Sequence, residues 1–251
     1  MSTAVRRSDL WFRNFAPAPT ASVRLVCLPH AGGSASFYLP VARGLSPSIE
    51  VIGAQYPGRQ DRRREPCLGT IGELADELTE ALVPWCDRPF ALFGHSMGAT
   101  LGYEITRRLE ACSDVALIHL FASGRRAPSV PSNDHVHERD DEGILAELKK
   151  LSGTMPRILG DEEIIRMAMP AIRADYTAVE TYVHDSGGPV RCPITVFAGD
   201  SDTRTSLEAA RKWREHTSGA FAFHVFPGGH FFVAEHSAQV LRLIRKTLLS
   251  G

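Results

Sequence analysis

The hydrophobic positions of this chain fall into short apolar runs that alternate with segments of helical periodicity. The runs are apolar at nearly every position and rich in β-branched residues, as are strands buried on both faces of a parallel sheet. They cover residues 23–28, 49–54, 90–94, 115–121, 194–198 and 221–226, and helical spacing marks 71–85, 97–110 and 234–249. Strands that alternate with helices predict a doubly wound α/β fold with a mostly parallel central sheet.

This alternation is interrupted between residues 126 and 190. The segment opens with loop residues, "RRAPSVPSND", and then shows helical patterns over 142–151, 161–169 and 170–183. A helical insertion in such a fold often covers a site, whereas the alternative is a subdomain without that role. The predicted organisation is a core in two parts, residues 1–125 and 191–251, with a helical lid insertion at 126–190.

Composition narrows the class of protein. Apolar residues make up 43% and charged residues 23% of the 251 residues, which suits a domain with a sizeable core. A net charge of −1 disfavours a nucleic-acid-binding surface. The five cysteines have neither metal-ligand nor disulfide spacing, and no signal peptide or membrane span is recognisable. We therefore expect a cytoplasmic protein that needs no metal and binds neither nucleic acid nor a membrane.

The stretch "GHSMG", residues 94–98, lies where a predicted strand ends and a predicted helix begins. It matches G-x-S-x-G, in which a sharp, strained turn presents a serine above the sheet and glycines make room for it. The following helix directs the positive end of its dipole toward the same place. Ser96 is therefore predicted to be a nucleophile, and the neighbouring His95 is interpreted as a packing residue that points away from it.

A serine nucleophile needs a base and an acid that orients the base, and in this fold the acid precedes the histidine. "GDSD", after the strand at 194–198, offers Asp200 and Asp202, and "PGGHFF", after the strand at 221–226, offers His230. Both loops follow carboxyl ends of strands, where open α/β sheets carry their sites. Asp202 is preferred as the acid because it lies further into its loop, and Asp200 is interpreted as bracing the turn.

Acyl transfer also needs donors for the oxyanion. One is expected from the residue after the nucleophile, Met97, and the other from the loop after an early strand. "LPHAGGSASF" follows the strand at 23–28, and its small residues allow the backbone to approach a substrate closely. The N–H of Ala31 is therefore predicted to be the second donor, and a plain glycine turn is the alternative.

Taken together, these motifs resemble those of the type II thioesterases, the stand-alone editing enzymes of polyketide synthases and nonribosomal peptide synthetases. The matching stretches are "LPHAGG" (28–33), "YPGRQDR" (56–62), "GHSMGA" (94–99), "GDSD" (199–202) and "FPGGHFF" (226–232), in the order of that family. The resemblance implies an α/β-hydrolase fold with a helical lid at 126–190 and no cofactor.

The resemblance also implies a substrate and a partner. The substrate would be an acyl group held as a thioester on the phosphopantetheine arm of an acyl or peptidyl carrier protein, and the role would be removal of stalled or aberrant acyl groups. The motif spacing by itself indicates only an acyl hydrolase. An esterase or acyltransferase that acts on a small free substrate is one alternative, and a catalytically idle binding module on the same fold is another.

The lid helices are predicted to have apolar faces that roof the site. The apolar side chains are Ile144, Leu145, Leu148 and Leu151 on the first helix, with Glu147, Lys149 and Lys150 facing elsewhere, and Ile172, Tyr176, Val179 and Val183 on the last. Asp161 suits an N-cap and Pro170 a first helical turn. The roof should be mobile, with "SGG" at 186–188 as a hinge. The alternative is that these faces pack only on each other.

A cluster of arginines follows the strand at 49–54. Arg59, Arg62, Arg63 and Arg64 fall within "GRQDRRREP", at the edge of the sheet that carries the predicted site. Carrier proteins of these synthases are typically acidic, so the cluster is a hypothetical docking surface for the partner. A solvated or internally paired loop is the alternative, with Arg59 holding the loop in place.

Overall fold

A computed structural model describes residues 8–112, 115–132, 134–152 and 162–249 of the chain. Within them, a seven-stranded sheet has the order β1-β3-β2-β4-β5-β6-β7. The strands are β1 (Phe12–Asn14), β2 (Arg24–Leu28), β3 (Glu50–Ala54), β4 (Phe90–His95), β5 (Leu117–Ser123), β6 (Ile194–Gly199) and β7 (Phe221–Phe226). Only β1 is antiparallel to its neighbour within this sheet. The mostly parallel sheet flanked by helices is therefore confirmed.

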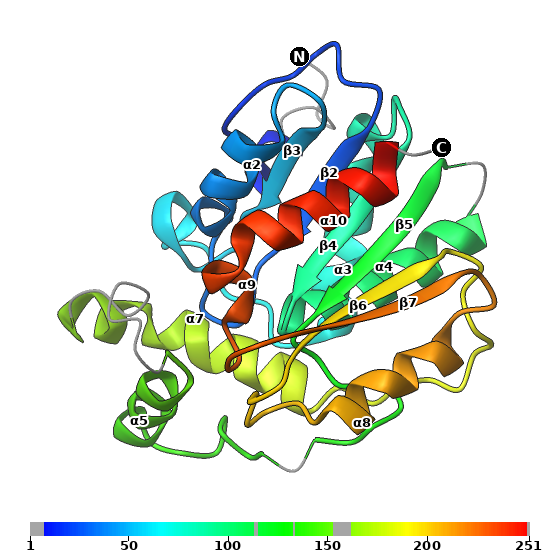
Figure 1. Cartoon of the computed structure of the whole chain (residues 1–251). Helices are drawn as coiled ribbons and strands as arrows, with labels where there is room; N and C mark the ends of the chain where they lie inside the picture. The colour runs from blue at the N-terminus through cyan, green and yellow to red at the C-terminus, as the bar shows by residue number, and fades with distance from the viewer. Residues whose placement is uncertain (1–7, 113–114, 133, 153–161, 250–251) are drawn as a thin grey trace.

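Helices cover both faces of this sheet (Figure 1). On one face lie α2 (Leu39–Leu45) and α10 (Ser237–Leu249), and on the other lie α3 (Ile71–Leu82) and α4 (Met97–Cys112). Successive strand residues alternate between the two layers, since Leu25 and Cys27 pack with α2 and α10 whereas Val26 and Leu28 pack with α3 and α4. Burial on both faces explains why these strands are apolar at nearly every position.

The remaining elements of the described chain are shorter or lie in the inserted segment. They include α5 (Asp141–Ser152), α7 (Glu162–Glu180), α8 (Leu207–Arg211), α9 (Phe232–Glu235) and the 3-10 helices η1 (Ala35–Tyr38), η2 (Gln60–Arg62), η3 (Val83–Trp85) and η4 (Lys212–His216). The periodicity missed β1, α2 and α8, because elements of three to seven residues hold too few positions to show a period. The helix expected at 71–85 changes to 3-10 geometry after Leu82, next to Pro84.

The two helices expected at 161–169 and 170–183 form one continuous helix, α7, and Pro170 lies inside it rather than in a first turn. Proline removes one backbone hydrogen bond from a helix interior. Apolar side chains on both sides of Pro170 join one buried cluster with α5, which holds the helix together across it: Ile144, Leu145, Ile165, Met169, Ile172 and Tyr176. The N-cap expected at Asp161 lies outside the described residues.

Two side chains of the insertion are placed differently from their predicted positions. Val183 is 85% exposed, because α7 ends at Glu180 before reaching it. Glu147, expected to face away from the apolar side, is buried and lies 2.8 Å from Arg204 and 3.0 Å from Arg139. An ion pair lets a carboxylate occupy a position that the helical period assigns to an apolar side chain.

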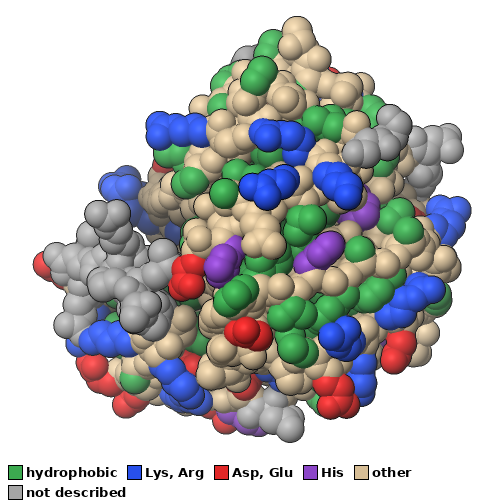
Figure 2. Space-filling view, in the orientation of Figure 1, with side chains coloured by type: hydrophobic (Ala, Val, Ile, Leu, Met, Phe, Trp, Pro, Cys, Tyr) green, Lys and Arg blue, Asp and Glu red, His purple; other side chains and the backbone are tan. Residues whose placement is uncertain are grey.

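The surface carries charges of both signs. Figure 2 shows Lys and Arg side chains gathered over α10, while acidic and basic side chains are mixed across the lower part of the same face. Among the described residues, no helix is both long and apolar enough to span a bilayer. The described thiols of Cys27, Cys67, Cys86 and Cys192 are free. The division of the chain into a core and a lid at 126–190 stays a prediction.

Candidate active site

Ser96 lies in the tight connection between β4 and α4, in a backbone conformation that is rare for a residue with a side chain. Its φ is +54°, in the left-handed region. Hydrogen bonds hold the turn on both sides, from Ser96 N–H to the carbonyl of Ser123 at 2.8 Å and from Ala99 N–H to the carbonyl of Ser96 at 2.9 Å. A strained residue fixed in this way is a common feature of functional sites, where strain costs about 1–3 kcal/mol.

The glycines that flank Ser96 are required by close backbone contacts. A Cβ on Gly94 would lie 2.0 Å from the carbonyl oxygen of Gly98, and a Cβ on Gly98 would lie 2.0 Å from that of Leu28. Both partners are backbone atoms, so the clash could not be relieved by a side-chain rotation. The G-x-S-x-G spacing therefore lets the amino end of α4 approach the ends of β4 and β2.

His230 and Asp202 form a buried pair at the ends of the last two strands. The Nδ1 of His230 lies 2.9 Å from Oδ2 of Asp202, and the side chains are 5% and 1% exposed. Because an ionised carboxylate can only accept, Nδ1 carries the proton and Nε2 is left as a base. Asp202 Oδ1 accepts the N–H of Arg204 at 2.8 Å, which fixes the carboxylate in its loop.

Asp200 makes different contacts. Its exposed carboxylate accepts hydrogen bonds from Ser201 Oγ at 2.8 Å and from Gly228 N–H at 3.0 Å. These bonds hold the pKa of the Asp200 carboxyl below its usual value. Asp200 thus joins the loop after β6 to the loop after β7, whereas Asp202 contacts the imidazole.

Two further histidines pack around His230. His95 is fully buried, and its Nδ1 forms a hydrogen bond with Ser123 Oγ at 3.0 Å. Its ring centroid lies 5.1 Å from that of His230. His30 packs edge-on to Phe231 with ring centroids 5.0 Å apart. Burial lowers the pKa of His95 well below its ordinary value, and burial and then the charge of His230 lower the pKa of His30 to about 3. Both rings are therefore neutral near pH 7.

The loop after β2 places Ala31 at a pocket that Ser96 and His230 also line. Two buried tyrosines hold the backbone just before it, since Tyr38 Oη donates to the carbonyl of Leu28 at 2.8 Å and Tyr56 Oη donates to that of Pro29 at 3.1 Å. The Met97 N–H begins α4, where the first N–H groups have no partner within the helix. The assignment of these two donors to an oxyanion stays a prediction.

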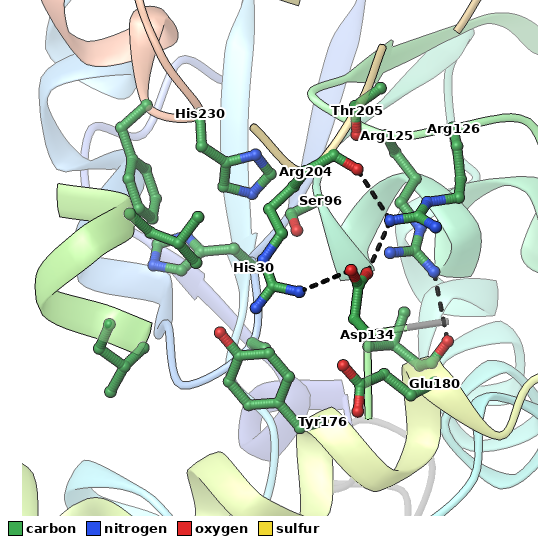
Figure 3. Close-up of a pocket in the computed structure, with 15 residues that line it drawn as sticks. His30, Ser96, Arg125, Arg126, Asp134, Tyr176, Glu180, Arg204, Thr205 and His230 are labelled. Atoms are coloured by element: carbon green, nitrogen blue, oxygen red, sulfur yellow. Dashed lines mark hydrogen bonds and ion pairs between the residues drawn. The ribbon is translucent and has the colours of Figure 1, made fainter. Parts of the chain in front are cut away.

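These side chains surround a pocket of about 540 Å³, including its open mouth. Figure 3 shows Ser96 and His230 on one side and Tyr176 and Glu180 of α7 on the other. The inserted helices contribute Leu148 and Leu151 from α5 and Tyr176, Val179 and Glu180 from α7. The pocket is therefore bounded by both the core and the inserted segment.

One wall of the pocket is charged, which the sequence analysis missed. Asp134 lies 2.7 Å from Arg126 and 3.0 Å from Arg204. Arg125 donates to the carbonyl of Val179 at 3.2 Å, and burial lowers its pKa to about 10, which leaves it charged at pH 7. The sequence did contain a signal for this wall, because these arginines follow the carboxyl ends of β5 and β6, at the edge of the sheet where the site lies.

The arginine cluster after β3 is divided between the interior and the surface. Arg59 and Arg62 are buried, whereas Arg63 and Arg64 are exposed. Arg62 pairs with Glu65 at 2.6 Å and packs over the ring of Trp11 at 4.3 Å. Arg59 and Arg62 are therefore not available for docking, in agreement with the alternative of an internally paired loop for these two.

Comparisons with known proteins identify the family. A thioesterase domain model matches residues 23–248. The chain is 51% identical over 248 residues to a probable cadicidin biosynthesis thioesterase of Streptomyces griseus, covering 99% of this chain and 68% of that protein. It is 46% identical to the thioesterase PikA5 of Streptomyces venezuelae, covering 96% and 86% of the two chains.

A solved structure agrees with this assignment. The type II thioesterase BorB from the borrelidin biosynthetic cluster is 48% identical and superposes with a TM-score of 0.91, covering 96% of this chain and 98% of that one. At this degree of similarity the two chains share one fold, so the α/β-hydrolase fold that the motifs imply is confirmed. The chain therefore belongs to the thioesterase family of serine-type thioester hydrolases, among the type II thioesterases.

Proposed function

We propose that this enzyme hydrolyses acyl groups from the phosphopantetheine arm of an acyl or peptidyl carrier protein, and so clears stalled or aberrant units from a polyketide or nonribosomal peptide synthase. The observation that carries the proposal is the buried His230–Asp202 pair at 2.9 Å beside the strained Ser96, in one pocket. The relatives named above support the class of pathway. This role places the enzyme in the cytoplasm, in keeping with the free thiols of the four cysteines whose side chains are described.

The proposed reaction has two steps. Nε2 of His230 takes the hydroxyl proton of Ser96 as its oxygen attacks the thioester carbonyl, and the oxyanion is held by the N–H groups of Ala31 and Met97. The C–S bond then breaks, the pantetheine sulfur takes the proton from His230 and leaves as the thiol, and an acyl-serine remains. His230 then deprotonates a water that attacks the acyl-serine, and Ser96 recovers its proton. Asp202 keeps the imidazole in the required tautomer and stabilises its cation.

A comparison of three substrates tests the proposal. The same acyl group is presented as a carrier-protein thioester, as a free pantetheine thioester and as an oxyester, and intact-mass analysis follows loss of the acyl group from the carrier. We expect the highest kcat/KM on the carrier thioester. A preference for the oxyester, or acyl transfer to an alcohol in place of water, would favour the esterase or acyltransferase alternative. Failure of a fluorophosphonate probe to label Ser96 would favour the binding module.

Bulky substitutions in the roof of the pocket are expected to change chain-length preference. Leu148 and Val179 line the pocket from α5 and α7, so Leu148→Phe and Val179→Phe should lower kcat/KM for the longest acyl chains several-fold and leave short chains little affected. Labelling by a small fluorophosphonate should stay nearly unchanged. Met167→Phe is the matched control, because Met167 lies on α7 but is 71% exposed. An unaltered preference in folded variants would contradict the roof.

Reversal of charge at Arg63 and Arg64 is expected to weaken docking of the carrier protein. These two exposed arginines lie at the edge of the sheet that carries the site. Arg63→Glu with Arg64→Glu should raise KM for carrier-bound substrate by roughly threefold to tenfold, most strongly at low salt, because exposed pairs act mainly on association. KM for acyl-pantetheine should not change. The same charge change at exposed Arg242 and Lys246 on α10 is the control, and equal effects on both substrates would exclude docking here.

A further inference from the structure

A buried ion pair joins the inserted helix α7 to the loop after β3, next to the loop that carries Ala31. Arg59 follows β3 and Asp175 lies on α7, and their side chains are 6% and 1% exposed. Both terminal guanidinium nitrogens donate to the carboxylate, from Nη1 to Oδ2 at 2.6 Å and from Nη2 to Oδ1 at 2.9 Å. Two parallel hydrogen bonds make this ion pair stronger than a single contact would, and they fix the orientation of the carboxylate relative to the guanidinium.

The same two side chains also hold the backbone directly after Ala31. Asp175 Oδ2 accepts the N–H of Gly32 at 2.7 Å, and Arg59 Nη1 donates to the carbonyl of Gly33 at 3.2 Å. The loop is tightly packed there, because Gly32 has a φ of +74° and a Cβ on it would lie 2.8 Å from Ile172 of α7. A displacement of α7 would therefore break the contacts that hold this loop.

Ala31 is thus fixed from both sides. Tyr56 holds the carbonyl of Pro29 before it, and Asp175 holds the N–H of Gly32 after it. The direction of a backbone N–H depends on the orientation of the peptide planes around it, and a donor that is displaced by a fraction of an ångström loses much of its effect on an oxyanion.

We propose that Asp175 is a positioning residue for the oxyanion donor at Ala31, and that Arg59 keeps Asp175 in place. This inference rests on the proposed function. Arg59 has a second effect, since an unpaired carboxylate this close to the loop would repel the negative charge that forms in the transition state. A carboxylate is the strongest available acceptor for the N–H of Gly32. Because Asp175 is paired with Arg59, it can accept this hydrogen bond without adding a net negative charge beside the oxyanion.

Two double variants test the proposal. Both carry Arg59→Met, so neither leaves a buried unpaired ion; one adds Asp175→Asn, which keeps an oxygen to accept the Gly32 N–H, and the other adds Asp175→Leu, which has a similar shape without an acceptor. We expect the Asn variant to keep kcat within about threefold of the wild type, and the Leu variant to lose kcat by about tenfold to 10²-fold. KM for an acyl-pantetheine thioester should stay within twofold in both. Equal kcat values in the two variants would overturn the proposal.

A second buried pair serves as the structural control. Arg24 and Glu50 lie 2.5 Å apart at the amino ends of β2 and β3, away from the pocket, with side chains 4% and 6% exposed. Arg24→Met with Glu50→Gln should lower the Tm and leave kcat unchanged, which separates positioning from stability.

One more variant covers the case in which the Leu double variant does not fold. Arg59→Lys keeps the charge but loses the fork, so it should lower kcat several-fold at constant KM, and an unchanged kcat would overturn the role of Arg59. Failure of the proposed function is distinguishable from these outcomes, because the wild type would then be inactive on the thioester or Ser96→Ala would stay active.

Discussion

Ser96→Ala is expected to abolish thioester hydrolysis, with less than about 1% of wild-type kcat remaining, while the protein stays folded. The hydroxyl is the proposed nucleophile, and removal of the nucleophile from such a triad leaves only the contribution of the oxyanion site and of binding. The strained turn should survive, because it is held by backbone hydrogen bonds of Ser96 and Ala99 that alanine also makes. The measurement is release of pantetheine thiol under saturating substrate, together with the Tm.

The control for this variant is Ser201→Ala. Ser201 lies on a loop at the same edge of the sheet, and its hydroxyl donates to Asp200 rather than to the pocket. Its loss should change kcat by less than about threefold. Substantial turnover by the Ser96→Ala variant would show that another group attacks the thioester.

Asp202→Asn is expected to lower kcat by up to about 10⁴ with little change in stability of the fold. In the wild type, the Asp202 carboxylate accepts a hydrogen bond from Nδ1–H of His230 at 2.9 Å. An asparagine can turn its NH₂ group toward Nδ1 instead, which favours the tautomer with the proton on Nε2. That nitrogen could then no longer accept the proton of Ser96.

Asp200→Asn is the matched comparison, since it makes the same chemical change two residues earlier. The Asp200 side chain is exposed and bonds only to loop atoms among the contacts described above, so we expect a loss of less than about tenfold in kcat. Both variants are assayed on the same acyl-pantetheine thioester, with kcat and KM determined separately. A larger loss for Asp200→Asn would transfer the acid role to Asp200.

The sequence was sufficient to locate residues whose role depends on a local turn or a strand end. The two glycines around Ser96 could be interpreted from spacing alone, because the turn that joins this strand to the helix brings backbone so close that a Cβ at either position would lie 2.0 Å from a carbonyl oxygen. The loops of Asp202 and His230 were also predictable, since carboxyl ends of parallel strands meet at one edge of a sheet. The preference for Asp202 over Asp200 depended only on its position further into the loop. The contact between Asp202 and His230 is visible only in the folded structure.

The inserted segment was predictable in part. Apolar periodicity identified the helices and the side of Leu148 and Val179 that meets the pocket. It divided α7 at Pro170, because proline usually marks a boundary in sequence while packing with α5 keeps this helix continuous. It assigned Glu147 to the wrong side, because the period of a helix carries no information on an arginine that arrives from elsewhere in the chain.

By itself, then, the sequence determined the α/β order, the strained serine turn and the edge of the sheet at which an aspartate and a histidine would follow. These properties depend on local conformation and on the direction of parallel strands. The tertiary structure alone decided that Arg59 is buried against Asp175, 116 residues away, and that the same carboxylate holds the loop of Ala31. A charged side chain in a loop looks the same in sequence whether it faces solvent or an ion partner, because its burial depends on a partner that only folding brings within hydrogen-bonding distance.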